Sequence, residues 1–252
     1  MVMLLGLGWA GTFKAWTGLQ LTPRQCLQMQ ASAWIGRYLP GKIGLLAGKM
    51  QACETGASWK QVTNSVLSEQ VAFIVSGLAL SALALPSWLP LLPRVARDSP
   101  HYLLVSILLA PSVVFIATGI WISKRILPHA KRTWSTRLLL WSAIGHLTAG
   151  GGFHILLSCL LSAPPTLNSS VGLLAMAHTA GIIAVFAPAG LGVREAVIVA
   201  ALAPLLGWTE ATAITALQRA FIVMADASIG LFSLTNKARI LRGKSDKTLN
   251  QS

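Results

Sequence analysis

Four basic residues lie at or beside two short stretches that interrupt otherwise apolar sequence. Arg37, Lys42 and Lys49 surround the first stretch, and Arg194 follows the second. A basic side chain beside the start of a helix, where backbone N–H groups have no intrahelical partner, is well suited to bind a phosphate. These four residues are therefore the candidate binding site for an anionic headgroup.

Further charged residues lie inside the apolar sequence that follows each interruption. An ionisable side chain in hydrocarbon costs roughly 2.5–3.5 kcal/mol on insertion scales, so such residues normally face a bundle interior. Arg219 and Asp226 are about two helical turns apart and share one helix face. Glu69 or Glu195 could pair with this face. We expect these four residues to form intramembrane ion pairs; the alternative is that the pairs are purely structural.

Three histidines, His146, His154 and His178, also lie in apolar segments. They fit either hydrogen-bonded packing groups, the commoner case, or a proton relay. The sequence contains no visible nucleophile–base pair or metal-ligand cluster, and its three cysteines form no CxxC motif. We therefore expect no enzymatic activity, no metal and no cofactor.

The composition indicates the kind of fold that must hold these residues. Of the 252 residues, 54% are hydrophobic and only 11% are charged, whereas soluble domains have roughly 25% charged residues. The sequence predicts an all-α, polytopic integral membrane helix bundle. In such a protein the net charge of +13 indicates cytoplasmic loops rather than nucleic-acid binding.

Four apolar segments are long enough to cross a membrane, which takes about 20 helical residues. They are residues 66–85, 102–122, 138–161 and 211–234. Residues 1–13 are apolar but too short, so we expect a shortened helix or the end of a longer one. The nine tryptophans, many near span ends, are interpreted as anchors at the membrane surface.

Charged residues in the loops predict the orientation. Residues 123–137 and the tail 236–252 are strongly basic and should be cytoplasmic, whereas the uncharged loop 162–170 should lie outside. When the spans between these loops are counted, the first interrupted segment is reached from the cytoplasmic side of the membrane and the second from the outside. The two segments are therefore oppositely oriented.

The two interruptions also resemble each other in sequence. PGKIG at 40–44 matches PAGLG at 188–192, and QVAFIV at 70–75 matches QRAFIV at 218–223, both 148 positions later. A common offset for two separate matches indicates an internal duplication. Inverted repeats with Pro/Gly-broken short helices are typical of transporters that bind substrate at the breaks.

The repeat units extend over about 25–85 and 171–235, within a single transmembrane domain covering 1–252. The apolar arms on either side of each break are too short to cross, so we predict two re-entrant segments in an inverted repeat. The residues expected to break the helices are Pro40, Gly41, Gly44, Pro188, Gly190 and Gly192.

Four motifs resemble the flippase-like transmembrane family named after the membrane region of lysylphosphatidylglycerol synthase. They are GRYLPGKIGLLAGK (36–49), SEQVAF (68–73), APAGLGVREA (187–196) and LQRAFIVMAD (217–226). The resemblance covers about 20–235 and implies an α-helical inner-membrane protein that handles an anionic phospholipid or lipid-linked precursor. It does not carry the synthase activity, which belongs to a separate soluble domain.

The chain departs from that family's pattern in three places. Less hydrophobic sequence precedes the first break, Leu45-Leu46 replaces an acid followed by a basic residue, and Glu69-Gln70 replaces a Glu-Arg pair.

Our leading hypothesis is a lipid flippase-like transporter of the bacterial inner membrane with a cytoplasmic C-terminus. Arg37, Lys42 and Arg194 would capture the headgroup of an anionic lipid or lipid-linked precursor, and nucleic acid would not be a partner. The alternatives are an accessory or scaffold subunit for an envelope-biosynthesis enzyme, and a transporter of a small soluble anion.

Overall fold

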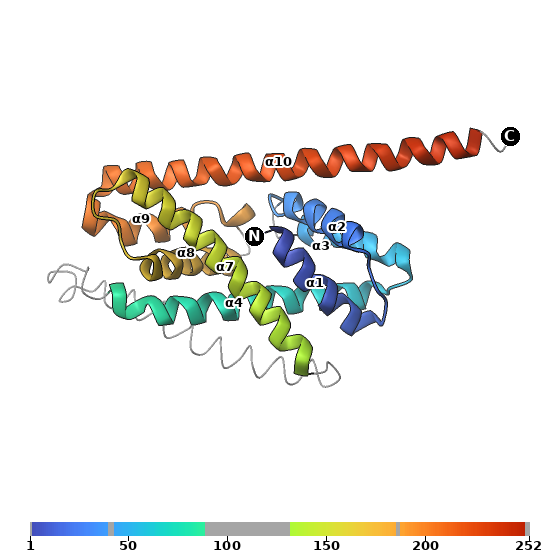
Figure 1. Ribbon diagram of the computed structural model, residues 1–252, viewed down its shortest axis with the longest axis horizontal. Coiled ribbons are helices and arrows are strands. Elements are labelled where there is room, and N and C mark those ends of the chain that lie inside the picture. Colours follow the sequence, from blue (N-terminus) through green and yellow to red (C-terminus); the bar gives the residue numbers. More distant parts are fainter. Residues whose placement is uncertain (1, 40–42, 89–131, 185–186, 250–252) are drawn as a thin grey trace.

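A computed structural model describes residues 2–39, 43–88, 132–184 and 187–249 (Figure 1). These ranges are helical with short connections and contain no strand, which confirms the all-α prediction. The helices, labelled as in Figure 1, are α1 (Val2–Thr17), α2 (Pro23–Gly36), α3 (Ile43–Met50), α4 (Trp59–Trp88), α7 (Arg132–Leu160), α8 (Leu167–Ile183), α9 (Val193–Leu206) and α10 (Trp208–Leu249). Two 3-10 turns, η2 (Gln51–Thr55) and η4 (Pro188–Gly190), follow α3 and precede α9.

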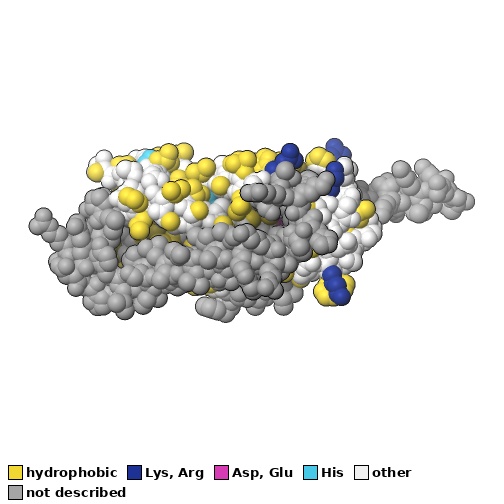
Figure 2. Space-filling model, turned by 90° about the horizontal axis from the view of Figure 1, so that it is seen from below, with side chains coloured by type: hydrophobic (Ala, Val, Ile, Leu, Met, Phe, Trp, Pro, Cys, Tyr) yellow, Lys and Arg dark blue, Asp and Glu magenta, His cyan; other side chains and the backbone are white. Residues whose placement is uncertain are grey.

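Four described helices are long and apolar enough to cross a membrane, in agreement with an integral membrane protein. They are Trp59–Ser87, Thr136–Leu160, Pro188–Leu206 and Trp208–Leu231. Three of them coincide with predicted spans, whereas the predicted span 102–122 lies outside the described residues. Figure 2 shows apolar side chains across the described part of one face, with Lys and Arg gathered toward one end.

The same order of elements occurs twice. The first unit (α1–α4) and the second unit (α7–α10) each consist of a helix, two shorter helices separated by a break, and a long helix. We call α2–α3 the first hairpin and α8–α9 the second hairpin. In the first hairpin Gly36 lies against Gly44, and Gly48 against Ala33, so α2 and α3 are antiparallel. α8 and α9 also pack against each other and run in opposite directions (Figure 1).

Local sequence determines where these short helices begin and end. The Thr22 side chain caps α2 by accepting the Gln25 N–H, and Pro23 occupies the first turn. At the second break, Ala189, Gly190 and Gly192 have φ angles of 51°, 71° and 81°. This left-handed backbone cannot continue a right-handed helix and favours glycine.

The two units pack crosswise. α4 packs against α8, α10 against α2, and α1 against α7, and the long helices α4 and α10 run along opposite sides of the molecule in opposite directions (Figure 1). Gly172 allows the approach of α8 to α4, because a Cβ there would lie 2.1 Å from the Ala84 Cβ. α1 also packs along α4, whereas the corresponding helices α7 and α10 make little contact.

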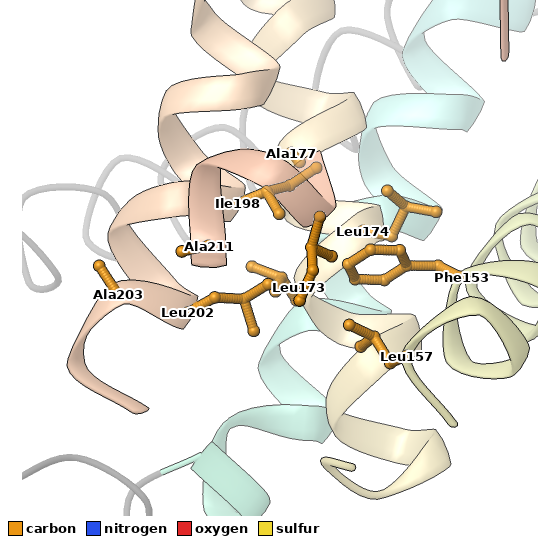
Figure 3. Packing of buried hydrophobic residues seen from close by; sticks show 10 residues of the cluster. Phe153, Leu157, Leu173, Leu174, Ala177, Ile198, Leu202, Ala203 and Ala211 are labelled. Carbon is orange, nitrogen blue, oxygen red and sulfur yellow. The ribbon is translucent and has the colours of Figure 1, made fainter. Parts of the chain in front are cut away.

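An apolar cluster holds the four helices of the second unit together at one end (Figure 3). Leu157 of α7, Leu174 of α8 and Leu202 of α9 are almost fully buried in it, and Ala211 brings in α10. Because lipid tails are as apolar as leucine, such a cluster stabilises a membrane protein by close packing rather than by burial from water. The cluster fixes the base of the second hairpin and so the position of its break.

Candidate functional site

The two breaks, which lie in different units, meet in the interior. The Ala189 N–H of the second break donates a hydrogen bond of 2.9 Å to the carbonyl oxygen of Arg37, the residue that caps α2. The charged residues that follow each break are therefore brought toward one region.

Asp226 of α10 is bound entirely by residues of the first unit. Its carboxylate accepts hydrogen bonds from Trp34 Nε1 at 2.7 Å, from the Arg37 guanidinium and from the Tyr38 hydroxyl. Arg37 also lies over the Trp34 ring, 4.1 Å from its centroid. This buried cluster ties the last helix to the end of the first hairpin's first arm.

Lys49 and Glu69 form a second buried ion pair, inside the first unit. The Lys49 side chain is 1% exposed, and its ammonium lies 4.3 Å from the centroid of the Trp9 ring. Gln30 Nε2 also donates to Glu69, at 3.5 Å. Both charges of this pair are enclosed by protein.

The ion pair of the second unit is looser. Arg219 Nη1 lies 3.5 Å from Glu195 Oε1, and none of the three guanidinium nitrogens of Arg219 has a hydrogen-bond partner among the described residues. Glu195 also accepts the N–H of Gly192 at 2.8 Å, so its carboxylate is shared with the start of α9. Arg219 lies 5.9 Å from the centroid of the Tyr38 ring, within reach of the Asp226 cluster.

Arg194 differs from the other buried cations because it has no hydrogen-bond or ion-pair partner among the described residues. Only 8% of the residue is exposed, yet it forms no hydrogen bond or ion pair with any part of the chain that the structure describes. Its side chain lies against Gly181, where a Cβ would come within 2.4 Å of the Arg194 Cγ. An uncompensated buried charge costs several kcal/mol. Burial of the Arg194 charge thus costs free energy that the packing contacts of its side chain do not offset.

His178 of α8 is buried in the same region with neither ring nitrogen hydrogen-bonded to a described residue. Its neighbour His146 lies 6.1 Å away, centroid to centroid, and differs because its Nε2 lies 2.9 Å from the Phe73 carbonyl oxygen.

Two cavities meet at these side chains. A small chamber of about 80 Å³ lies between the hairpins and α4, and Lys49 and Glu69 contribute to its wall. A larger groove of about 770 Å³ lies between α7 and α10. Most side chains that line this groove are apolar or small, among them Phe153, Leu156 and Ile222. Its polar lining consists of Gln218, Asp226 and residues that it shares with the chamber. The residues that line both cavities are Trp34, Arg37, His178 and Arg194.

This arrangement places a buried guanidinium, that of Arg194, at one end of a groove lined mainly by apolar side chains. The chain matches no family model, no curated protein and no solved structure. Its function must therefore be inferred from the residues of this site.

The predicted site residues are only partly brought together. Arg37, Lys49 and Arg194 line the small chamber, but Arg37 and Lys49 are each bound to a carboxylate. Gly44 lies within α3 and packs against Gly36, so it serves helix contact rather than the break itself. Pro188, Gly190 and Gly192 lie at the second break. Pro40, Gly41 and Lys42 lie outside the described residues.

Sequence reasoning missed Trp34 and Tyr38, and it named His178 only as a packing group or part of a proton relay, not as a residue of this site. The interpretation of tryptophans as surface anchors is wrong for Trp34 and also for Trp9, which is fully buried. A signal was present, since Trp34 lies three and four positions before Arg37 and Tyr38, a spacing that places residues on one helix face.

Proposed function

We propose that this chain is a lipid flippase-like transporter that moves an anionic phospholipid or lipid-linked precursor across the bacterial inner membrane. The observation that carries the proposal is the buried Arg194, which has no partner among the described residues and lies at the junction of a small chamber and an apolar groove. A neutral lipid would not pair with the guanidinium of Arg194, and a small soluble anion would not fill the apolar groove. An anionic lipid uses both.

The charges around the breaks support an anionic substrate. The described side chains comprise four cations (Arg37, Lys49, Arg194 and Arg219) and three anions (Glu69, Glu195 and Asp226). One positive charge is left over in a region where charge is expensive. A phosphate group at Arg194 would balance it with charge-assisted hydrogen bonds.

The groove between α7 and α10 suits the rest of such a molecule. Its volume lies in the range of roughly 300–1,000 Å³ that is usual for ligand sites, and its wall includes Phe221 and Ile229 of α10 and Ile155 of α7. We propose that an acyl chain lies in this groove while the headgroup contacts Arg37 and Arg194.

We also propose that both hairpins are re-entrant and belong to an inverted repeat. At 1.5 Å per residue, α2 and α9 are about 21 Å long and α3 about 12 Å, shorter than the ~30 Å hydrocarbon core. Pro188–Leu206 reaches the length of a span only when η4 is counted with α9. The breaks then lie deep in the membrane and covered by protein, where irregular backbone is tolerated.

The basic residues support a cytoplasmic C-terminus. Lys14 at the end of α1, Arg24 at the start of α2 and Lys60 at the start of α4 lie toward one end of the molecule, and α10 extends past that end to the C-terminus (Figure 1). By the positive-inside rule this end is cytoplasmic. The second hairpin then enters from outside and the first from the cytoplasm.

Lipid movement in proteoliposomes tests the proposal. The full chain is reconstituted in phosphatidylcholine vesicles with tail-labelled fluorescent phosphatidylglycerol, and dithionite bleaches the outer leaflet. Arg194→Ala is expected to slow movement by about tenfold or more, as for the loss of a charged hydrogen bond of about 1.5–3 kcal/mol. The matched control Arg24→Ala removes an exposed arginine at the start of α2 and should leave the rate unchanged.

Two results would refute the proposal. One is an Arg194→Ala protein as fast as wild type. The other is equally fast movement of labelled phosphatidylcholine, because the site would then not select negative charge. Lipid-independent uptake of inorganic phosphate would instead favour the small-anion transporter.

A further inference from the structure

His178 is the one polar side chain of the two-cavity junction that the proposed function leaves without a role. It is 5% exposed, lines both the chamber and the groove, and uses neither ring nitrogen within the described chain. Buried polar atoms are nearly always hydrogen-bonded, so an exception calls for a ligand or a solvent partner. Here the exception lies beside Arg37 and Arg194.

We infer that His178 is a headgroup ligand that binds a proton together with the anion, so that lipid and proton are moved together. This inference rests on the proposed function. In the imidazolium form both ring nitrogens are donors, and a phosphate oxygen is a strong acceptor. The proton comes from the aqueous phase and is released with the lipid on the other side.

The charges that face His178 couple the two binding events. Arg194 on α9 and Arg37 on α2 line both cavities with it, and His146 is its titratable neighbour on α7. A proton on His178 in the empty site would add a third positive charge to this group. An anion between them removes that repulsion, so each ligand favours the other, and the coupling must be reciprocal.

Nearby carboxylates do not replace the anion. Glu69 on α4 faces the chamber but is bound to Lys49 and Gln30. Asp226 on α10 faces the groove but already accepts from Trp34, Arg37 and Tyr38. Within the described residues, the charge on a protonated His178 is therefore balanced best by a bound ligand.

Proton uptake by the wild-type protein is the first test, and it does not depend on a variant that folds. Phosphatidylglycerol, whose phosphodiester stays ionised between about pH 5 and 8, is added to the full chain in weakly buffered detergent with a pH-indicator dye. We expect uptake approaching one proton per lipid bound, and an apparent affinity that rises up to about tenfold per pH unit on acidification. Binding without proton uptake would overturn the inference and leave the proposed function intact.

His178→Gln is the second test, and His154→Gln is its matched control. His154 also lies in an apolar helix, but its Nδ1 contacts the Ser170 hydroxyl at 3.3 Å and it lines neither cavity. His178→Gln should lose the pH dependence of phosphatidylglycerol binding, whereas His154→Gln should keep the wild-type slope. If His178→Gln keeps the slope, the inference fails; if the wild type binds no phosphatidylglycerol at any pH, the proposed function fails with it.

Discussion

The two units have the same order of helices but differ in how tightly the helices around each break are packed. In the first unit α1 packs along α4, and the Lys49–Glu69 pair is enclosed. In the second unit a groove separates α7 from α10, the Glu195–Arg219 pair is looser, and Arg194 has no partner among the described residues. The same order of helices therefore pairs the buried charges of the first unit and leaves Arg194 of the second unit without a described partner.

Removal of one acid from each unit tests this difference most directly. Glu69→Gln leaves Lys49 buried and unpaired, and should lower the free energy of unfolding by about 3–5 kcal/mol. Glu195→Gln acts on a quarter-exposed carboxylate and should cost about 1 kcal/mol or less. Reversible unfolding in detergent micelles measures both. Equal losses of unfolding free energy in the two variants would show that both ion pairs are buried to the same extent, and would contradict the difference between the units.

Removal of one arginine from each break should change stability in opposite directions. Arg37→Met leaves Asp226 buried without its cation and should destabilise the protein by about 3–5 kcal/mol. Arg194→Met removes a buried charge that forms no ion pair with a described residue, so it should raise the midpoint of thermal unfolding while lipid movement falls. An unfolding midpoint that falls in Arg194→Met would mean that Arg194 has a structural role.

Gly181 should matter because it makes room for Arg194. In Gly181→Ala the new Cβ would lie 2.4 Å from the Arg194 Cγ and 2.6 Å from its Cδ, so the arginine must shift, at a cost of about 1–3 kcal/mol. The control is Gly151→Ala, where the Cβ meets nothing within 4 Å. Thermal unfolding and lipid movement are measured for both variants. If Gly151→Ala loses lipid movement as Gly181→Ala does, the loss is not caused by the displacement of Arg194.

Filling the groove should give the smallest change in stability. Ala225 and Ala220 are both exposed alanines of α10, but only Ala225 lines the groove. Ala225→Trp should slow lipid movement while the free energy of unfolding stays within about 0.5 kcal/mol of wild type. Ala220→Trp should change neither. Identical rates of lipid movement in the two variants would show that the lipid does not use the groove.

The all-helical fold and the second break are features that the sequence predicts well, because they depend on local composition. Apolar length predicts a helix, and glycines at positive φ explain why the chain breaks around Gly190 and Gly192. Arg37 and Arg194, by contrast, both stand close to a Pro/Gly break in the sequence. Only the structure shows that Arg37 pairs with a carboxylate 189 positions away, whereas Arg194 has no such partner among the described residues.

The distances along the chain between these partners have a consequence for biosynthesis. Lys49 and Glu69 are 20 residues apart, so at about 5–20 residues per second both are made within roughly 1–4 s. Arg37 and Asp226 are 189 residues apart, which takes roughly 10–40 s at the same rates. For that time the nascent first unit must hold Arg37 without the carboxylate of α10. Arrival of the last helix is thus the step at which this arginine is neutralised.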